Sequence, residues 1–178
     1  MVSKKNLPNL ITLIRLSICP FIIMIILSLN YFGIISANYV AIIMAIIFSS
    51  DFLDGYFARK YEATTTLGAL FDGLADKLII YAILLFYLNR HELWYLSIYF
   101  LLMRDFLIVS LKHYAAEKKI KIDVVWSAKL KFTLECLLAF SLLYKFFSFS
   151  NILLVIIVIV AWYSAIEYYL NFLKKYYS

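Results

Sequence analysis

Apolar runs of about 20 residues follow one another along this chain, and each is long enough to cross a bilayer as an α-helix. Their Ile, Leu and Phe residues are contiguous rather than alternating with polar residues, which excludes a transmembrane β-barrel. Apolar residues make up 65% of the 178 residues, whereas soluble proteins contain roughly half. The sequence therefore predicts an all-α integral membrane protein.

We expect six membrane spans, at about residues 8–30, 36–58, 66–88, 93–114, 125–146 and 150–172. The connections between them are short, which favours antiparallel neighbours in one bundle, and residues 1–178 are expected to form a single domain. An even number of spans places both termini on the same side of the membrane.

The positions of the basic residues indicate which side of the membrane holds the termini. Most of them flank the spans on the side of the termini, against Arg90 and Lys145 on the other side. The flanking residues on the terminal side are Lys4, Lys5, Arg59, Lys60, Lys118, Lys119, Lys121, Lys174 and Lys175. By the positive-inside rule this side is cytoplasmic. The net charge of +6 is therefore mainly a topology signal, and no basic run is clustered with exposed aromatic residues as nucleic-acid binding would require.

Charged residues within the spans gather in their cytoplasmic halves, except Arg104 and Asp105, which lie nearer mid-span. A charged side chain in hydrocarbon costs roughly 3 kcal/mol or more. Charges concentrated on one side therefore predict a polar cavity within the bundle that opens to the cytoplasm.

Two pairs of aspartates lie in the second and third spans. Asp51 and Asp54 are three residues apart, and Asp72 and Asp76 are four apart, so each pair occupies one helix face. At 1.5 Å per residue the pairs lie roughly 8 to 13 Å and 9 to 15 Å from the cytoplasmic ends of their spans. Carboxylates at one depth repel each other unless cations bind between them. Oxygen ligands without Cys or His suit Mg²⁺ or Mn²⁺, with Ca²⁺ as an alternative.

A structural interpretation of these aspartates competes with the metal site. In that interpretation they are packing or ion-pair residues, and Lys77 or Arg59 neutralises part of their charge. Small residues in the same segment let a helix or a ligand approach closely. These are Gly55, Ala58, Gly68 and Gly73.

The segment "DFLDGYFARKYEATTTLGALFDGLAD" fits the pattern D-x2-D-G-x2-A-R-x8-G-x3-D-x3-D and resembles the signature of the CDP-alcohol phosphatidyltransferases. Three further segments, "NLPNLITLIRLSICP", "MRDFLIVSLK" and "WSAKLKFTLE", are similar to parts of the bacterial phosphatidylglycerophosphate synthases. The resemblance covers most of residues 6–135.

This resemblance implies transfer of a phosphatidyl group from CDP-diacylglycerol to a small alcohol, with release of CMP. It implies that Asp51, Asp54, Asp72 and Asp76 hold two divalent metal ions, and that Asp76 is also the general base. It further implies that the CDP-diacylglycerol-binding residues are Asn9, Thr12, Gly55, Ala58, Arg59 and Gly68. A homodimer in the bacterial cytoplasmic membrane is expected on the same ground.

Four basic residues match the positions that bind the acceptor phosphate in the phosphatidylglycerophosphate synthases. They are Arg104, Lys112, Lys129 and Lys131. A phosphorylated alcohol needs such cations, so glycerol 3-phosphate is the expected acceptor. The alternatives are a structural ion pair of Arg104 with Asp105 or Glu135, and snorkelling of the two lysines of the fifth span to the membrane surface.

The chain departs from the usual family pattern near the expected acceptor pocket. It has "DGLAD", "RD" and "AKLKF" where relatives read D-P-x-A-D, R-E and G-K-x-K-T. Inositol phosphate, serine and phosphatidylglycerol are therefore alternative acceptors. A small cation transporter is the alternative of a different class, since carboxylates within a membrane also mark ion pathways. The sequence shows neither the broken helices nor the repeated halves typical of transporters.

Overall fold

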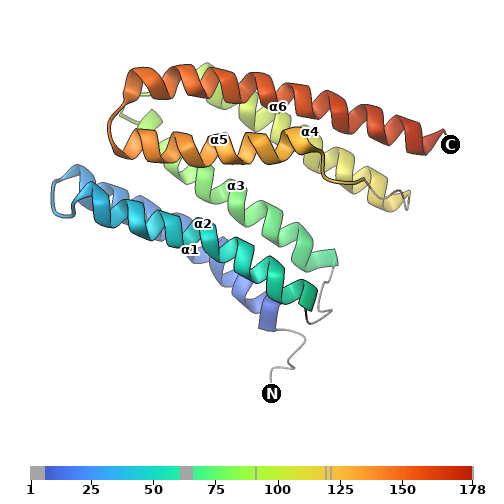
Figure 1. Cartoon of the computed structure of the whole chain (residues 1–178), viewed down its shortest axis with the longest axis horizontal. Helices are drawn as coiled ribbons and strands as arrows, with labels where there is room; N and C mark the ends of the chain where they lie inside the picture. Colours follow the sequence, from blue (N-terminus) through green and yellow to red (C-terminus); the bar gives the residue numbers. More distant parts are fainter. Residues whose placement is uncertain (1–6, 61–65, 91, 119, 121, 178) are drawn as a thin grey trace. The chain divides into compact units, whose positions relative to one another are not determined.

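Helices begin and end close to the predicted limits of the apolar runs. The computed structural model describes residues 7–60, 66–90, 92–118, 120 and 122–177, with side chains described from Ser17 to Phe48, at Leu74 and within the described part from Lys77 onward. Over these residues the fold contains six α-helices and no strand (Figure 1). They are α1 Leu7–Tyr31, α2 Ala37–Lys60, α3 Thr66–Leu88, α4 Tyr95–Glu117, α5 Trp126–Leu143 and α6 Phe147–Tyr176. The prediction of an all-α fold with six helices is confirmed.

Helix α6 is the one helix in the described part of the chain that is both long and apolar enough to cross a membrane. The described portions of α1, α2 and α3 contribute shorter apolar helices, Ser17–Tyr31, Ala37–Phe48 and Lys77–Leu88. Helices α4 and α5 carry charged residues in their central turns, which lowers their hydropathy.

The chain divides into two compact units, Met1–Arg90 and His91–Ser178, with three helices in each. In the first unit α1 packs against both α2 and α3. The side chains buried there repeat at intervals of four residues, so each helix presents one apolar face to the others. They include Ile23 and Leu27 on α1, Val40 and Met44 on α2, and Ile79 and Ile83 on α3.

The turn between α1 and α2 is short because α1 ends in a Schellman motif. Gly33 has φ of 75°, a conformation that favours glycine. Its N–H donates to the carbonyl of Asn30 at 3.0 Å, and the N–H of Ile34 donates to the carbonyl of Leu29 at 2.9 Å. The side chain of Asn30 also donates to the carbonyl of Ile35. The two backbone bonds satisfy carbonyls in the last turn of α1, and the side-chain bond holds the turn that follows.

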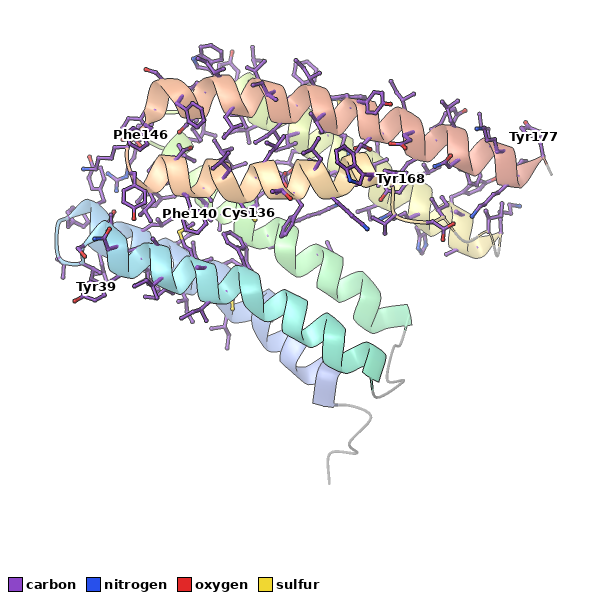
Figure 2. The ribbon with its side chains drawn as sticks, in the orientation of Figure 1. Tyr39, Cys136, Phe140, Phe146, Tyr168 and Tyr177 are labelled. Atoms are coloured by element: carbon purple, nitrogen blue, oxygen red, sulfur yellow. The ribbon has the colours of Figure 1, made fainter. Side chains whose placement is uncertain are left out.

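In the second unit α6 packs against both α4 and α5. Figure 2 shows side chains of these three helices filling the space between them. The apolar core includes Leu101 and Ile108 from α4, Leu138 and Leu142 from α5, and Leu154 and Ile157 from α6. The buried polar groups described below lie on the same three helices.

A side-chain amide joins the beginnings of α4 and α6. Asn151 accepts a hydrogen bond from the backbone N–H of Trp94 at 3.0 Å and donates one to the carbonyl of Glu92, also at 3.0 Å. The amide therefore satisfies two backbone groups just before α4, where no local side chain caps the helix.

The α5–α6 connection is equally tight and lacks a glycine. Lys145 has φ of 61° and stands where a Schellman motif usually places Gly. Its N–H donates to Leu142 and the N–H of Phe146 donates to Ser141, both at 3.0 Å. Helix α5 therefore ends at Leu143, three residues before the predicted limit of its span.

Candidate functional site

The four aspartates of the motif lie on helical backbone near the connection of α2 and α3. Asp51 and Asp54 are in the last three turns of α2, and Asp72 and Asp76 in the first three turns of α3. Their side chains lie outside the described ones. The connection 61–65 is short, so the two helix ends lie at most roughly 23 Å apart. With a rise of about 1.5 Å per residue, both pairs lie at similar distances from these ends. The convergence of the carboxylates themselves stays a prediction.

The predicted nucleotide-binding residues belong to the same unit. They are Asn9 and Thr12 on α1, Gly55, Ala58 and Arg59 on α2, and Gly68 on α3. Their side chains also lie outside the described ones, so their role in binding CDP-diacylglycerol stays a prediction. Helix α1 packs against both α2 and α3, and the three helices therefore bring these segments into one unit.

Four charged residues are buried together in the second unit. Arg104 and Asp105 come from α4, and Lys131 and Glu135 come from α5. Each exposes 5% or less of its surface. Burying a charge this deeply costs free energy unless the charge is paired. The contacts of each of the four side chains therefore show how its charge is compensated.

Asp105 links the two cations. Its Oδ1 is 2.7 Å from Nη1 of Arg104, and both of its carboxylate oxygens accept hydrogen bonds from Nζ of Lys131 at 3.0 Å. Lys131 also lies 2.9 Å from Oε1 of Glu135, one turn further along α5. Nζ of Lys131 thus lies within 3.0 Å of three carboxylate oxygens. With two cations and two anions, the network formed by Arg104, Asp105, Lys131 and Glu135 is formally neutral.

Helix α6 holds the other side of the guanidinium. Nε of Arg104 donates to the carbonyl oxygen of Ala161 at 2.9 Å, and Nη2 donates to the hydroxyl oxygen of Ser164. That hydroxyl in turn donates to Ala161 O at 2.7 Å. The guanidinium is therefore bonded to groups on two helices, which fixes its plane.

A polar stripe extends from this network along α5 and α6. Ser127, Lys131 and Glu135 are spaced four residues apart on α5 and share one buried face. Ser127 donates a 2.6 Å hydrogen bond to Oε2 of Glu167, which follows Ser164 by one turn on α6. The stripe runs toward the start of α5 and the end of α6, the end that the basic residues predict to be cytoplasmic.

The other two lysines predicted to bind phosphate lie at the surface. Lys112 is exposed on α4, and its Nζ lies 4.9 Å from the ring centroid of Tyr168, a cation–π contact. Tyr168 is labelled on α6 in Figure 2. Lys129 is exposed on α5. The structure therefore brings Arg104 and Lys131 together through Asp105, whereas Lys112 and Lys129 remain at the surface.

Some of the contacts in this buried network could be predicted from the sequence. The alternative that Asp105 pairs with Arg104 is confirmed, while Glu135 pairs with Lys131. Sequence reasoning missed Ser164, whose only signal is a small polar residue on the inner face of an otherwise apolar helix. The carbonyl of Ala161 carries no sequence signal at all.

The family model for the CDP-alcohol phosphatidyltransferases matches residues 5–164. The chain belongs to the CDP-alcohol phosphatidyltransferase family. The matched range contains the aspartate motif, the whole buried network and Ser164. The resemblance inferred from the motif is confirmed, and so is the expectation that the chain is an enzyme of this family.

Curated relatives cover most of the chain. A protein of Wigglesworthia glossinidia brevipalpis is 34% identical over 180 residues, and the match covers 98% of this chain and 94% of the relative. A protein of Rickettsia typhi is 33% identical over 131 residues, covering 74% and 72% respectively. A protein of Haemophilus influenzae is 30% identical over 163 residues, covering 89% and 86%. All three bear the name CDP-diacylglycerol–glycerol-3-phosphate 3-phosphatidyltransferase.

Proposed function

We propose that this protein transfers a phosphatidyl group from CDP-diacylglycerol to glycerol 3-phosphate, giving phosphatidylglycerophosphate and CMP in phospholipid biosynthesis. The observation that carries the proposal is the complete aspartate motif on α2 and α3, inside the range that matches the family. The names of the relatives support glycerol 3-phosphate as the acceptor.

Asp51, Asp54, Asp72 and Asp76 are proposed to hold two divalent cations. The donor set fits this role, because four carboxylates without Cys or His are hard oxygen ligands that favour Mg²⁺ or Mn²⁺. Bound there, the cations would neutralise the pyrophosphate and stabilise the departing CMP. Ca²⁺ is proposed to occupy the same ligands without supporting turnover.

The proposed reaction is one direct displacement. A hydroxyl oxygen of the acceptor forms a bond to the phosphorus that carries diacylglycerol, the bond from this phosphorus to the bridging oxygen breaks, and CMP leaves with that oxygen. Asp76 accepts the hydroxyl proton as general base. Binding of the cytidine diphosphate is assigned to Asn9, Thr12, Gly55, Ala58, Arg59 and Gly68.

The acceptor phosphate is proposed to bind to Arg104, Lys112, Lys129 and Lys131. A guanidinium has five N–H groups, and three of those on Arg104 donate to Asp105, Ala161 and Ser164. Among the described residues the other two N–H groups have no acceptor, and we propose that they donate to phosphate oxygens. Because the buried network is formally neutral, we assign the excess positive charge that attracts the phosphate to the exposed Lys112 and Lys129.

A membrane location is proposed for the whole chain, as one domain with six spans. Large apolar side chains form an exposed stripe on α6 at intervals of three and four residues, as expected of a helix face in contact with lipid. The stripe consists of Ile152, Ile156, Ile159, Tyr163 and Ile166. In this setting both termini and the active site face the cytoplasm, the lipid donor enters laterally, and the polar acceptor enters from the aqueous side. A homodimer is proposed from the family resemblance alone.

The decisive test is release of CMP by the purified protein with Mg²⁺ or Mn²⁺, CDP-diacylglycerol and glycerol 3-phosphate. Asp76→Asn should abolish release without loss of helical structure. The matched control is Asp123→Asn, because Asp123 is an exposed aspartate that pairs with Lys175. No CMP with any of glycerol 3-phosphate, inositol phosphate, serine and phosphatidylglycerol would reject the enzymatic proposal. Release with another acceptor alone would reject only the choice of glycerol 3-phosphate.

A further inference from the structure

We propose that Asp105 and Ser164 are positioning residues, which hold Arg104 and Lys131 in the geometry that binds the phosphate monoester of the acceptor. The inference rests on the proposed function and extends it to two residues that would not themselves contact the reacting atoms.

The carboxylate of Asp105 sets the distance between the two cations. Nη1 of Arg104 and Nζ of Lys131 both contact its Oδ1, at 2.7 Å and 3.0 Å. Two cations less than about 6 Å apart repel each other in a low-dielectric interior. Asp105 offsets this repulsion and keeps the side chains of α4 and α5 close enough for one phosphate to contact both.

Ser164 sets the orientation of the guanidinium. Its hydroxyl accepts from Nη2 of Arg104 and donates to Ala161 O, which also accepts from Nε. These contacts hold one edge of the guanidinium on α6, while Asp105 holds Nη1 from α4. A guanidinium whose plane is fixed before binding loses less freedom when it makes paired bonds to a phosphate.

Stability alone does not require such a network. Buried ion pairs can often be replaced by apolar residues of similar volume with no loss of stability. The network also lies on the polar stripe that leads along α5 and α6 toward Ser127 and Glu167. Its place on this stripe favours a role in binding over a role in packing.

The experiment compares two serines of α6 that are equally buried. Both Ser164 and Ser150 are 0% exposed, and Ser150 bonds to Ser141 instead of to the charged network. For the full chain in lipid, we would measure kcat, the KM of each substrate and the inhibition constant of inorganic phosphate. Ser164→Ala should raise the KM of glycerol 3-phosphate and the inhibition constant about tenfold, because one bond to a charged group is lost. Its kcat and its KM for CDP-diacylglycerol should change less than about twofold, and Ser150→Ala should resemble the wild type.

A second pair of variants addresses Asp105. Asp105→Asn should raise the same two constants by at least as much as Ser164→Ala, and Asp105→Glu should restore most of the affinity by keeping the charge. Unchanged constants in Ser164→Ala and Asp105→Asn would overturn the inference while leaving the proposed function intact. A parallel fall of kcat in Ser164→Ala and Ser150→Ala, with lower thermal stability of both, would also overturn it, in favour of packing. A wild-type protein that releases no CMP, or that uses only an acceptor without phosphate, would reject the proposed reaction and this inference together.

Discussion

Lys131 on α5 donates hydrogen bonds to both carboxylate oxygens of Asp105 on α4, at 3.0 Å each. Both side chains are buried, so neither charge is compensated by water. Helices α4 and α5 each pack mainly against α6. The contact between Lys131 and Asp105 therefore connects, within the second unit, two helices that otherwise pack little against each other.

Replacing this lysine should destabilise the second unit. Lys131→Met leaves the carboxylates of Asp105 and Glu135 without their shared cation, which we expect to cost about 3–5 kcal/mol of unfolding free energy. Lys129→Met is the control, because Lys129 is exposed on the same helix and its loss should change stability by less than about 0.5 kcal/mol. Denaturant unfolding in detergent measures both. Equal effects in the two variants would contradict a paired, buried lysine.

Removing divalent cations should abolish activity reversibly. Chelation is expected to stop CMP release, and Mg²⁺ or Mn²⁺ should restore it, because the proposed ligands are carboxylates alone. Ca²⁺ should compete with Mg²⁺ without restoring turnover. Full activity in the chelated protein would reject the proposed metal site.

Lys112 should affect acceptor affinity more than a comparable surface lysine does. Lys112→Ala is expected to raise the KM of glycerol 3-phosphate about three- to tenfold with kcat nearly unchanged, because a cation that attracts the phosphate is lost. Lys118→Ala is the matched control. Lys118 is also exposed and lies over a tyrosine ring, 5.7 Å from the centroid of Tyr114. Similar kinetics in both variants would contradict a role of Lys112 in the acceptor pocket.

The turn after α5 offers a stabilising substitution. Lys145 has φ of 61°, a conformation that costs a non-glycine residue roughly 1 kcal/mol. Lys145→Gly should therefore raise the unfolding free energy by about 0.5–1 kcal/mol. Lys118 caps α4 with φ of −81°, so Lys118→Gly should lower stability by a similar amount. Thermal unfolding of the two variants in parallel should give shifts of opposite sign.

The helices were predictable because long uninterrupted apolar runs are typical of membrane spans, for which a helix is the expected backbone conformation. The limits of α3 agree with its predicted span, 66–88. Helix α6 continues four residues beyond its predicted span, to Tyr176, because hydropathy reports where apolar residues end and not where backbone hydrogen bonds end. Helix α5 stops early because Lys145 adopts a left-handed conformation that no local residue pattern signals.

The sequence predicted which charged residues belong to the candidate site, but not which partners each of them contacts. Arg104 and Asp105 are adjacent in sequence, so their ion pair could be weighed in advance. The bonds from Arg104 to α6 join residues 57 and 60 positions apart, and one acceptor is a backbone carbonyl. Such partners depend on how helices α4 and α6 rotate against each other, which a single sequence does not encode in any local pattern.

The amide of Asn151 has a consequence for biosynthesis. It satisfies the N–H of Trp94, 57 residues earlier in the chain. Because a ribosome makes the chain from the N-terminus, Trp94 is synthesised 57 residues before its hydrogen-bond acceptor. The hydrogen bond at the start of α4 can therefore form only after synthesis of α6 has begun, and a nascent chain truncated before Asn151 would lack the acceptor for the N–H of Trp94.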